Sequence, residues 1–321
     1  MRLARIRLAT IALLALCAPA ADAQTDDVPP VVDPLRSQAL ADQPLFYLAT
    51  NVALGMVSST ITAWIRDKPV KPAVLGGAMG GAVTWMGMRL LGTEQRALAF
   101  VGLQTSAVGA SITRNAGNGI GLLDELTFTP FPLYITVRPR ATESRVSVRV
   151  SAAALVAAAS FLSASRWDLE PDWGETLAAG VLVLRSPRLW EPPTTGQPAG
   201  CSMDTICDGA LLGRQWSGVL FYTAGQGPSV SRQILTHELV HVAQFSREAI
   251  TYAVPASDAV LSLFGDPGRA VSRYLVLDWF TPVRFGNRVL GSIDDGSTYL
   301  ELEADAMRGA LGQCERAGHH C

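Results

Sequence analysis

Charged side chains are scarce in this chain, and neither sign of charge dominates. Asp, Glu, Lys and Arg together make up 17% of the 321 residues, and the formal net charge is −2. A protein that binds nucleic acid through its phosphates needs a basic patch or stripe, and the sequence has no such stretch. We therefore expect no nucleic-acid partner. The hydrophobic content of 49% is high for a soluble domain and needs its own explanation.

The first 23 residues have the three parts of a secretory signal peptide. Arginines precede an apolar run over residues 8–20, and Ala21-Asp22-Ala23 fits the small-x-small cleavage pattern. Cleavage there would make Gln24 the first residue of the mature chain, whereas the alternative is an uncleaved N-terminal anchor. We expect an exported protein that is periplasmic or membrane-associated in a bacterial envelope.

Cysteine is also rare, and four of the five cysteines lie beyond the signal peptide. An even number of cysteines in an exported chain predicts disulfides. The close spacings favour Cys201 with Cys207 and Cys314 with Cys321, although four cysteines allow three connectivities. The alternative for the C-terminal pair is a second metal site shared with the two adjacent histidines.

Long apolar segments occupy residues 45–65, 73–91 and 97–113. The second contains Gly76-Gly77 and Gly80-Gly81, which on a helix would form one flat face that another backbone can approach closely. Two interpretations of these segments remain open. Residues 45–91 are long enough for a membrane hairpin with a basic turn between its arms. Polar residues such as Asn51 instead favour helices buried in a soluble or peripheral domain.

From residue 125 the chain changes to β character. Residues 126–138 are rich in strand-forming side chains, and residues 145–150 alternate strictly between polar residues and valine. Residues 177–185 and 217–223 are further predicted strands, and 186–200 a surface loop. The predicted fold is α+β. A signal peptide (1–23) and an apolar, Gly-rich helical region (24–124) precede a domain (125–321) with a small sheet and a zincin-like helix pair.

The stretch Thr236-His237-Glu238-Leu239-Val240-His241 carries the clearest chemical signal. Positions i and i+4 share one face of a helix, so His237 and His241 can bind one metal ion together. Glu238 would then act as the general base toward water instead of binding the metal. In the alternative interpretation, the two histidines are ordinary residues of an amphipathic helix.

A catalytic zinc usually has three protein ligands and one open position. The candidate third ligand is Glu301, near the start of a second predicted helix that follows Gly296-Ser297-Thr298. Asp305 shares the face of Glu301 and would accept a hydrogen bond from a ligand histidine, whereas Glu303 points away. The alternative is an acidic helix start that interacts well with the helix dipole.

H-E-x-x-H followed by E-x-x-x-D on a second helix resembles the gluzincin metallopeptidases. The form Glu301-Leu302-Glu303-Ala304-Asp305 is most similar to the integral-membrane endopeptidases that include CAAX-prenyl and HtpX-like proteases. Residues 237–244 also resemble the H-E-x-x-H-x-x-Q pattern of many bacterial metallopeptidase-like proteins. The resemblance covers residues 217–311 at most. It implies that the strand over 218–223 forms the edge of the cleft and pairs with extended substrate.

Two features depart from that family. The signal peptide would place the motif outside the cytoplasm, whereas the sites of those proteases face the cytosol. The family's downstream oxyanion-stabilising residue has no clear match, and Tyr274, Arg308 and His319 are only candidates for that role.

These observations predict a zinc-dependent peptidase or endopeptidase-like hydrolase that acts on peptide or protein outside the cytoplasm. Zn²⁺ is the expected cofactor, and residues 45–91 are the candidate site of membrane association. The first alternative is a non-catalytic binding or assembly module of the envelope that keeps a zincin-like metal site. The second is a structural membrane-associated protein whose motif arose by chance.

Overall fold

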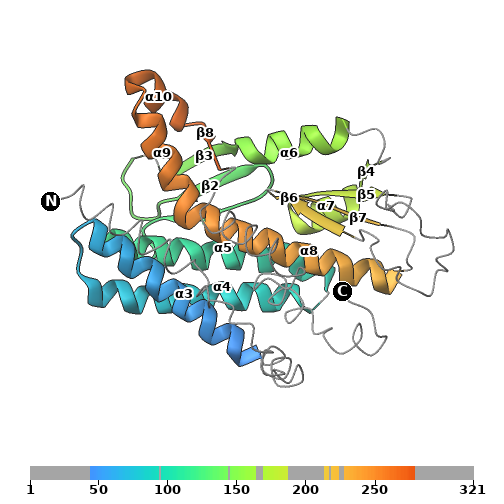
Figure 1. Cartoon of the computed structure of the whole chain (residues 1–321), viewed down its shortest axis with the longest axis horizontal. Helices are drawn as coiled ribbons and strands as arrows, with labels where there is room; N and C mark the ends of the chain where they lie inside the picture. The colour runs from blue at the N-terminus through green and yellow to red at the C-terminus, as the bar shows by residue number, and fades with distance from the viewer. Residues whose placement is uncertain are drawn as a thin grey trace, which may run out of the picture.

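The structure is a computed structural model that describes residues 44–93, 95–143, 145–163, 169–186, 213–216, 218–223 and 228–278. Its fold is mixed α+β, as the sequence predicts. Three long helices come first: α3 (Pro44–Ile65), α4 (Val70–Leu91) and α5 (Arg96–Asn118). Figure 1 shows these helices on one side of the molecule and the strands on the other, with α8 (Pro228–Glu248) running between them. The predicted signal peptide lies outside the described residues.

The three N-terminal helices pack through glycine. A Cβ atom on Gly81 would lie 2.2 Å from the carbonyl oxygen of Asn51, and one on Gly77 would also meet the backbone of α3. Gly76 and Gly80 instead face α5, where a Cβ on Gly80 would lie 2.6 Å from a backbone oxygen. The expectation of one flat glycine face is therefore wrong, because the two pairs form two faces, one for each neighbouring helix.

Polar side chains of α3 face inward. Asn51, Ser58 and Ser59 are buried, and the Ser59 hydroxyl donates to the carbonyl of Ala73 across the interface with α4. Large apolar side chains are exposed instead: Leu54, Val57 and Trp64 on α3, and Leu75, Met79 and Met86 on α4. Of the described helices, only α3 has the length and hydropathy of a membrane span, over Leu45–Ile65.

The first sheet has the order β1-β2-β3-β8. Its strands are β1 (Leu126–Phe128), β2 (Leu133–Val137), β3 (Val146–Ser151) and β8 (Leu275–Val276). The predicted β segment over 126–138 is an antiparallel hairpin, and the strand predicted over 145–150 is confirmed as β3. The sequence did not predict β8, which pairs in parallel with β3 across more than 120 residues of chain.

The second sheet has the order β4-β5-β7-β6. It contains β4 (Glu170–Pro171), β5 (Leu182–Ser186), β6 (Gly213–Trp216) and β7 (Val219–Thr223), so the strand predicted over 217–223 is confirmed. The strand predicted over 177–185 is wrong in its first half. Helix α7 (Trp173–Ala179) occupies that part because Asp172 caps its first turn, and Gly180 ends it with a φ of 69°. The predicted loop beyond Ser186 lies outside the described residues.

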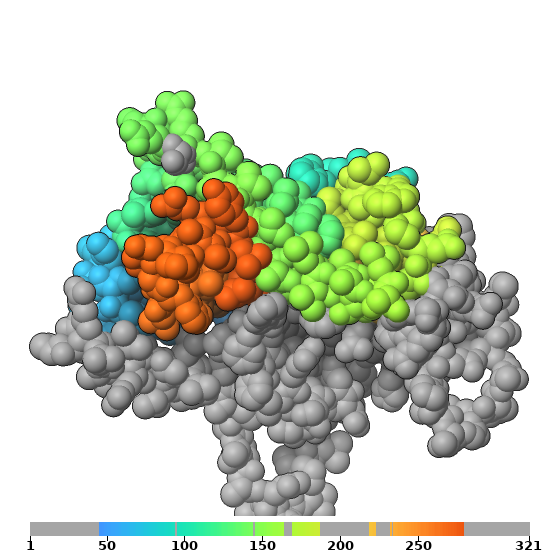
Figure 2. All heavy atoms as spheres, turned by 90° about the horizontal axis from the view of Figure 1, so that it is seen from above, coloured from blue at the N-terminus to red at the C-terminus, as the bar shows by residue number. Residues whose placement is uncertain are grey.

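Four further helical elements complete the described chain. They are α6 (Ala152–Ser163), the π-helical turn η3 (Ala249–Ala253), α9 (Val254–Ser262) and α10 (Gly265–Ser272). Figure 2 shows the surface of α9 and α10, in orange, as a lobe beside the green surface of the β1–β3 region. The buried carboxylate of Asp278 ties the end of this segment back to the first sheet, because it accepts hydrogen bonds from Tyr134, Ser151 and the backbone N–H of Ala153.

One hydrophobic core joins the helices to the second sheet. Its buried side chains come from α3, α4, α5, β5, β7 and α8, and they include Tyr47, Met88, Leu103, Val183, Leu220, Leu239 and Val240. The core therefore contains residues from both sides of position 124, where the sequence predicts a domain boundary. The middle turns of α8 contribute to this core. The helix therefore packs against α4 and α5 on one side and against the second sheet on the other.

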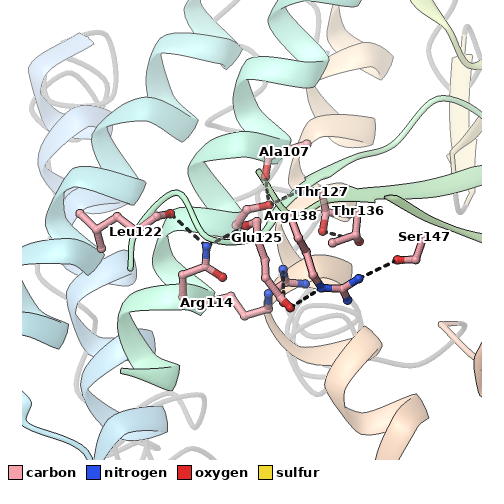
Figure 3. A network of polar contacts seen from close by, with 10 residues as sticks. Ala107, Arg114, Leu122, Glu125, Thr127, Thr136, Arg138 and Ser147 are labelled. Atoms are coloured by element: carbon pink, nitrogen blue, oxygen red, sulfur yellow. Dashed lines mark hydrogen bonds and ion pairs between the residues drawn. The ribbon is translucent and has the colours of Figure 1, made fainter. Parts of the chain in front are cut away.

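A buried polar network ties α5 to the first sheet (Figure 3). The guanidinium of Arg114 is 7% exposed and lies 3.4 Å from Glu125, whose other oxygen accepts from Arg138 Nε at 2.7 Å. Burial lowers the pKa of Arg114, and the carboxylate of Glu125 acts against that shift. The amide of Asn115 donates to the carbonyls of Leu122 and Glu125, which fixes the turn between α5 and β1.

Candidate metal centre

Helix α8 carries the H-E-x-x-H motif and confirms the predicted helix. It runs unbroken from Pro228 to Glu248, with α4 and α5 on one side and β6 and β7 on the other. Leu239, Val240 and Ala243 lie within the shared core. These apolar residues pack in the core, so packing as well as local sequence fixes the direction in which the motif residues point.

The two histidines of the motif converge. The Nε2 atoms of His237 and His241 are 3.1 Å apart, and their rings meet edge to face with centroids 4.7 Å apart. Two nitrogens that bind one tetrahedral zinc at 2.0–2.1 Å would lie about 3.4 Å from each other. The pair therefore has nearly the separation that a shared zinc ion requires, and both rings are partly exposed.

Gln244 contacts the second histidine from one turn further along. Its Oε1 atom lies 2.8 Å from Nδ1 of His241, and its side chain is 2% exposed. The sequence interpretation used Gln244 only as part of a family pattern and gave it no role. The spacing of three residues on a helix was the signal that could have identified this contact.

Glu238, the predicted general base, follows His237 directly and is 6% exposed. Among the described residues, no group of three or more His, Cys, Asp or Glu side chains is arranged to hold a metal ion. The predicted third ligand Glu301 and its neighbour Asp305 lie outside those residues. So do Arg308, His319 and the four cysteines Cys201, Cys207, Cys314 and Cys321. Tyr274 is described and is 69% exposed just before β8.

A second polar cluster fixes the first turns of α8. Arg232 donates from both terminal nitrogens to the carboxylate of Glu175 on α7, each at 3.1 Å. The hydroxyl of Tyr222 on β7 donates to Asp172 at 2.8 Å. Burial and this hydrogen bond raise the pKa of Tyr222 to about 12, so the tyrosine remains a donor at neutral pH. The sequence interpretation missed this cluster, which orients the motif helix against the second sheet.

The family resemblance implies that β7 forms the edge of a cleft, but β7 is not an edge strand. It pairs in parallel with β5 and antiparallel with β6, so both of its edges are occupied. Within the described part of the chain, β6 is the outer strand next to α8. An extended peptide that adds to this sheet would therefore pair with β6.

Comparison with known proteins gives no match. No family model, no curated protein and no solved structure is significantly similar to this chain. The resemblance to gluzincins therefore depends on the motif residues themselves and on the geometry of the histidine pair.

Proposed function

We propose that this protein is a zinc-dependent, gluzincin-type peptidase that acts outside the cytoplasm, in the cell envelope. The observation that carries the proposal is the pair of Nε2 atoms of His237 and His241, 3.1 Å apart on one face of α8. The adjacent carboxylate of Glu238 supports catalysis over a structural role. A closed structural zinc site more often completes its shell with a fourth Cys or His and needs no base.

Each residue of the motif then has a separate task. His237 and His241 supply two ligands, and Glu301 is proposed as the third. Zinc bound there would polarise the scissile carbonyl and lower the pKa of the attacking water. Glu238 accepts a proton from that water at its carboxylate and delivers it to the leaving amine. Because Gln244 already contacts Nδ1 of His241, Asp305 is proposed as the partner of the other histidine.

We place this enzyme at a membrane because α3 and α4 have the reverse of the usual polarity. Each has 22 residues and is about 33 Å long, close to the thickness of a bilayer core. Their exposed faces are apolar, whereas polar side chains and glycines face inward. Arg66, Lys68 and Lys71 are exposed at the turn between them, where they would meet anionic head groups.

The motif helix is hydrogen-bonded to α3. Arg247 donates to the side-chain oxygen of Asn51 at 2.7 Å, and the hydroxyls of Tyr252 and Ser58 are 2.7 Å apart. These contacts lie at the end of α8 and in the π-helical turn that follows it. Membrane anchoring through α3 would therefore hold the proposed active site at a fixed position relative to the bilayer.

The decisive experiment compares the purified wild-type protein with a Glu238→Gln variant. The amide is nearly isosteric, so we expect unchanged zinc content and melting temperature. Hydrolysis of an unstructured protein should fall by about 10²–10⁴-fold, the contribution of a positioned general base. Glu303→Gln is the matched control, since Glu303 would lie opposite Glu301 on the helix that the sequence predicts, and its activity should equal that of the wild type.

Two outcomes would contradict the enzyme. Wild type and Glu238→Gln could cleave a broad panel of peptides equally poorly while both bind zinc, which would favour the non-catalytic envelope module. Alternatively, His237→Ala could keep full zinc content, which would remove the metal site itself. In the proposed enzyme, His237→Ala loses stoichiometric zinc because two protein ligands seldom hold it against a chelator.

A further inference from the structure

We infer that Gln244 is a positioning residue that fixes the tautomer of His241 so that its Nε2 lone pair faces the metal position. The inference rests on the proposed zinc site and assigns a role to a residue outside the H-E-x-x-H motif. It starts from one contact, the 2.8 Å separation between Gln244 Oε1 and His241 Nδ1.

The chemistry of that contact determines where the proton lies. An amide oxygen only accepts hydrogen bonds, so Nδ1 of His241 must carry the hydrogen. A neutral imidazole with its hydrogen on Nδ1 has its lone pair on Nε2. Nε2 is the atom that faces His237 at 3.1 Å. The contact therefore prepares His241 as a ligand before any metal arrives.

Burial favours this arrangement. Gln244 is 2% exposed, so water does not compete freely for its amide oxygen. With the amide oxygen toward the ring, the other tautomer would point the lone pair of Nδ1 at the lone pairs of Oε1, and Nε2 would direct a hydrogen at the metal position. Both residues belong to one continuous helix, so the contact needs no other segment of the chain to form.

The inference explains the spacing H-E-x-x-H-x-x-Q in physical terms. Gln244 follows His241 by three residues, which places the two side chains on neighbouring positions of one helix face. A ligand histidine normally donates its second N–H to a carboxylate, a backbone carbonyl or water. Here the buried side-chain amide of Gln244, on the same helix, is the acceptor.

The test uses two variants of the full-length mature protein. Gln244→Met keeps the approximate size of the side chain and removes the acceptor, so zinc affinity should fall by about 10–100-fold in a chelator competition. Gln244→Glu keeps an acceptor oxygen and should bind zinc at least as well as the wild type. Ser246→Ala is the control, because Ser246 is equally buried on α8 but bonds to Thr129, and its affinity should not change.

A second readout measures the tautomer directly in the metal-free protein. The ¹⁵N chemical shifts of His241 should show hydrogen on Nδ1 in the wild type and in Gln244→Glu, but a shift toward the Nε2–H form in Gln244→Met. Hydrogen on Nε2 in the wild type would overturn the inference, as would equal loss of zinc affinity in the Met and Glu variants. If the wild type binds no zinc at all, the proposed function fails, while the metal-free spectra still decide the role of Gln244.

Discussion

The helices α3–α5 and the helix α8 are packed by opposite means. The first three approach one another through glycines such as Gly77 and Gly80, and they bury Asn51 and Ser59 while large apolar side chains stay exposed. Helix α8 instead buries large apolar residues such as Leu239 against the strands of the second sheet. The second arrangement is driven mainly by removing apolar surface from water, whereas the glycine contacts among the first three helices remove little of it.

The two kinds of packing stabilise their regions by different interactions. Close glycine contacts gain dispersion and interhelical hydrogen bonds but remove little large apolar surface, which is the way helices associate in lipid. Helix α8 instead buries large apolar side chains on several of its faces, together with polar residues such as Gln244 and Glu248. A single chain can combine both because α5 is largely buried from Gly102 to Gly117 and contributes to both regions.

The strongest destabilisation is expected from a methyl group placed between α3 and α4. Gly81→Ala would place a Cβ atom 2.2 Å from the carbonyl oxygen of Asn51, so the two backbones must separate. In an ordinary helix the same change stabilises by about 1 kcal/mol. Here we expect destabilisation of about 3 kcal/mol, at the upper end of overpacking costs. Thermal unfolding of the detergent-solubilised protein measures it.

The control adds more bulk on the outer face of the same helical layer. Ala53 is exposed on α3, so Ala53→Val should change stability by less than about 0.5 kcal/mol. If Gly81→Ala proves more stable than the wild type, the helices are further apart than the structure describes.

The apolar outer face of α4 should contribute to membrane binding. The protein should sediment with membranes, resist a carbonate wash and be released by detergent. Leu75→Ser, Met79→Ser and Met86→Ser together remove about 3 kcal/mol of apolar transfer free energy, so the membrane partition coefficient should fall by about 100-fold. Flotation with liposomes that contain anionic lipid, at several lipid concentrations, measures this coefficient.

The control for that variant removes exposed apolar side chains elsewhere. Val146→Ser, Val148→Ser and Leu263→Ser change three exposed residues of β3 and of the turn between α9 and α10, and they should leave membrane binding intact. A wild-type protein that is soluble as a dimer without detergent would show that a second copy, and not lipid, covers the outer face of α4.

The sequence predicted those elements whose signals are local. Helix α8 follows from apolar residues at helical spacing around His237 and His241, and β3 from strict alternation. The two glycine faces of α4 were also predictable, because adjacent residues on a helix are about 100° apart and Gly76 and Gly77 must face different neighbours. Pairing between β3 and β8 was not predictable, since nothing in either strand specifies a partner more than 120 residues away.

Helices α6 and α7 were not predicted, although each has a helical pattern in its sequence that a neighbouring strand pattern obscured. Residues 152–163 are rich in alanine, the strongest helix former, yet they follow directly on β3. In α7, the apolar residues that continue into β5 suggested a strand, although Asp172 and Glu175 have the spacing of a capping box. Of the candidate site, His237, Glu238 and His241 were proposed from their spacing, and their roles stay predictions. The contact of Gln244 depends on a side-chain orientation that sequence alone leaves open.

A milder destabilisation is expected when the cap of α7 is removed. Asp172→Ala removes the oxygens that accept from the backbone N–H of Glu175 and from the hydroxyl of Tyr222, which should cost about 2 kcal/mol of stability at neutral pH. Burial acts to raise the pKa of Asp172, but the hydrogen bonds from Glu175 and Tyr222 outweigh it, and the net pKa is lowered. A carboxylate whose pKa is lowered by folding stabilises the folded state above its unfolded value, near 3.9 for Asp. That contribution is lost as the pH falls through the lower folded value.

The stability difference between wild type and Asp172→Asn should therefore be present at pH 7 and should shrink as the pH falls below about 4. Urea unfolding at several pH values measures it. Glu170→Gln is the control, because Glu170 is 68% exposed and lies 3.7 Å from a half-exposed Arg185, so its ion pair should contribute little at any pH. A difference for Asp172→Asn that stays constant down to pH 3 would mean that the charge of Asp172 does not act in the folded state. The cap would then hold α7, and with it the start of α8, through a neutral hydrogen bond alone.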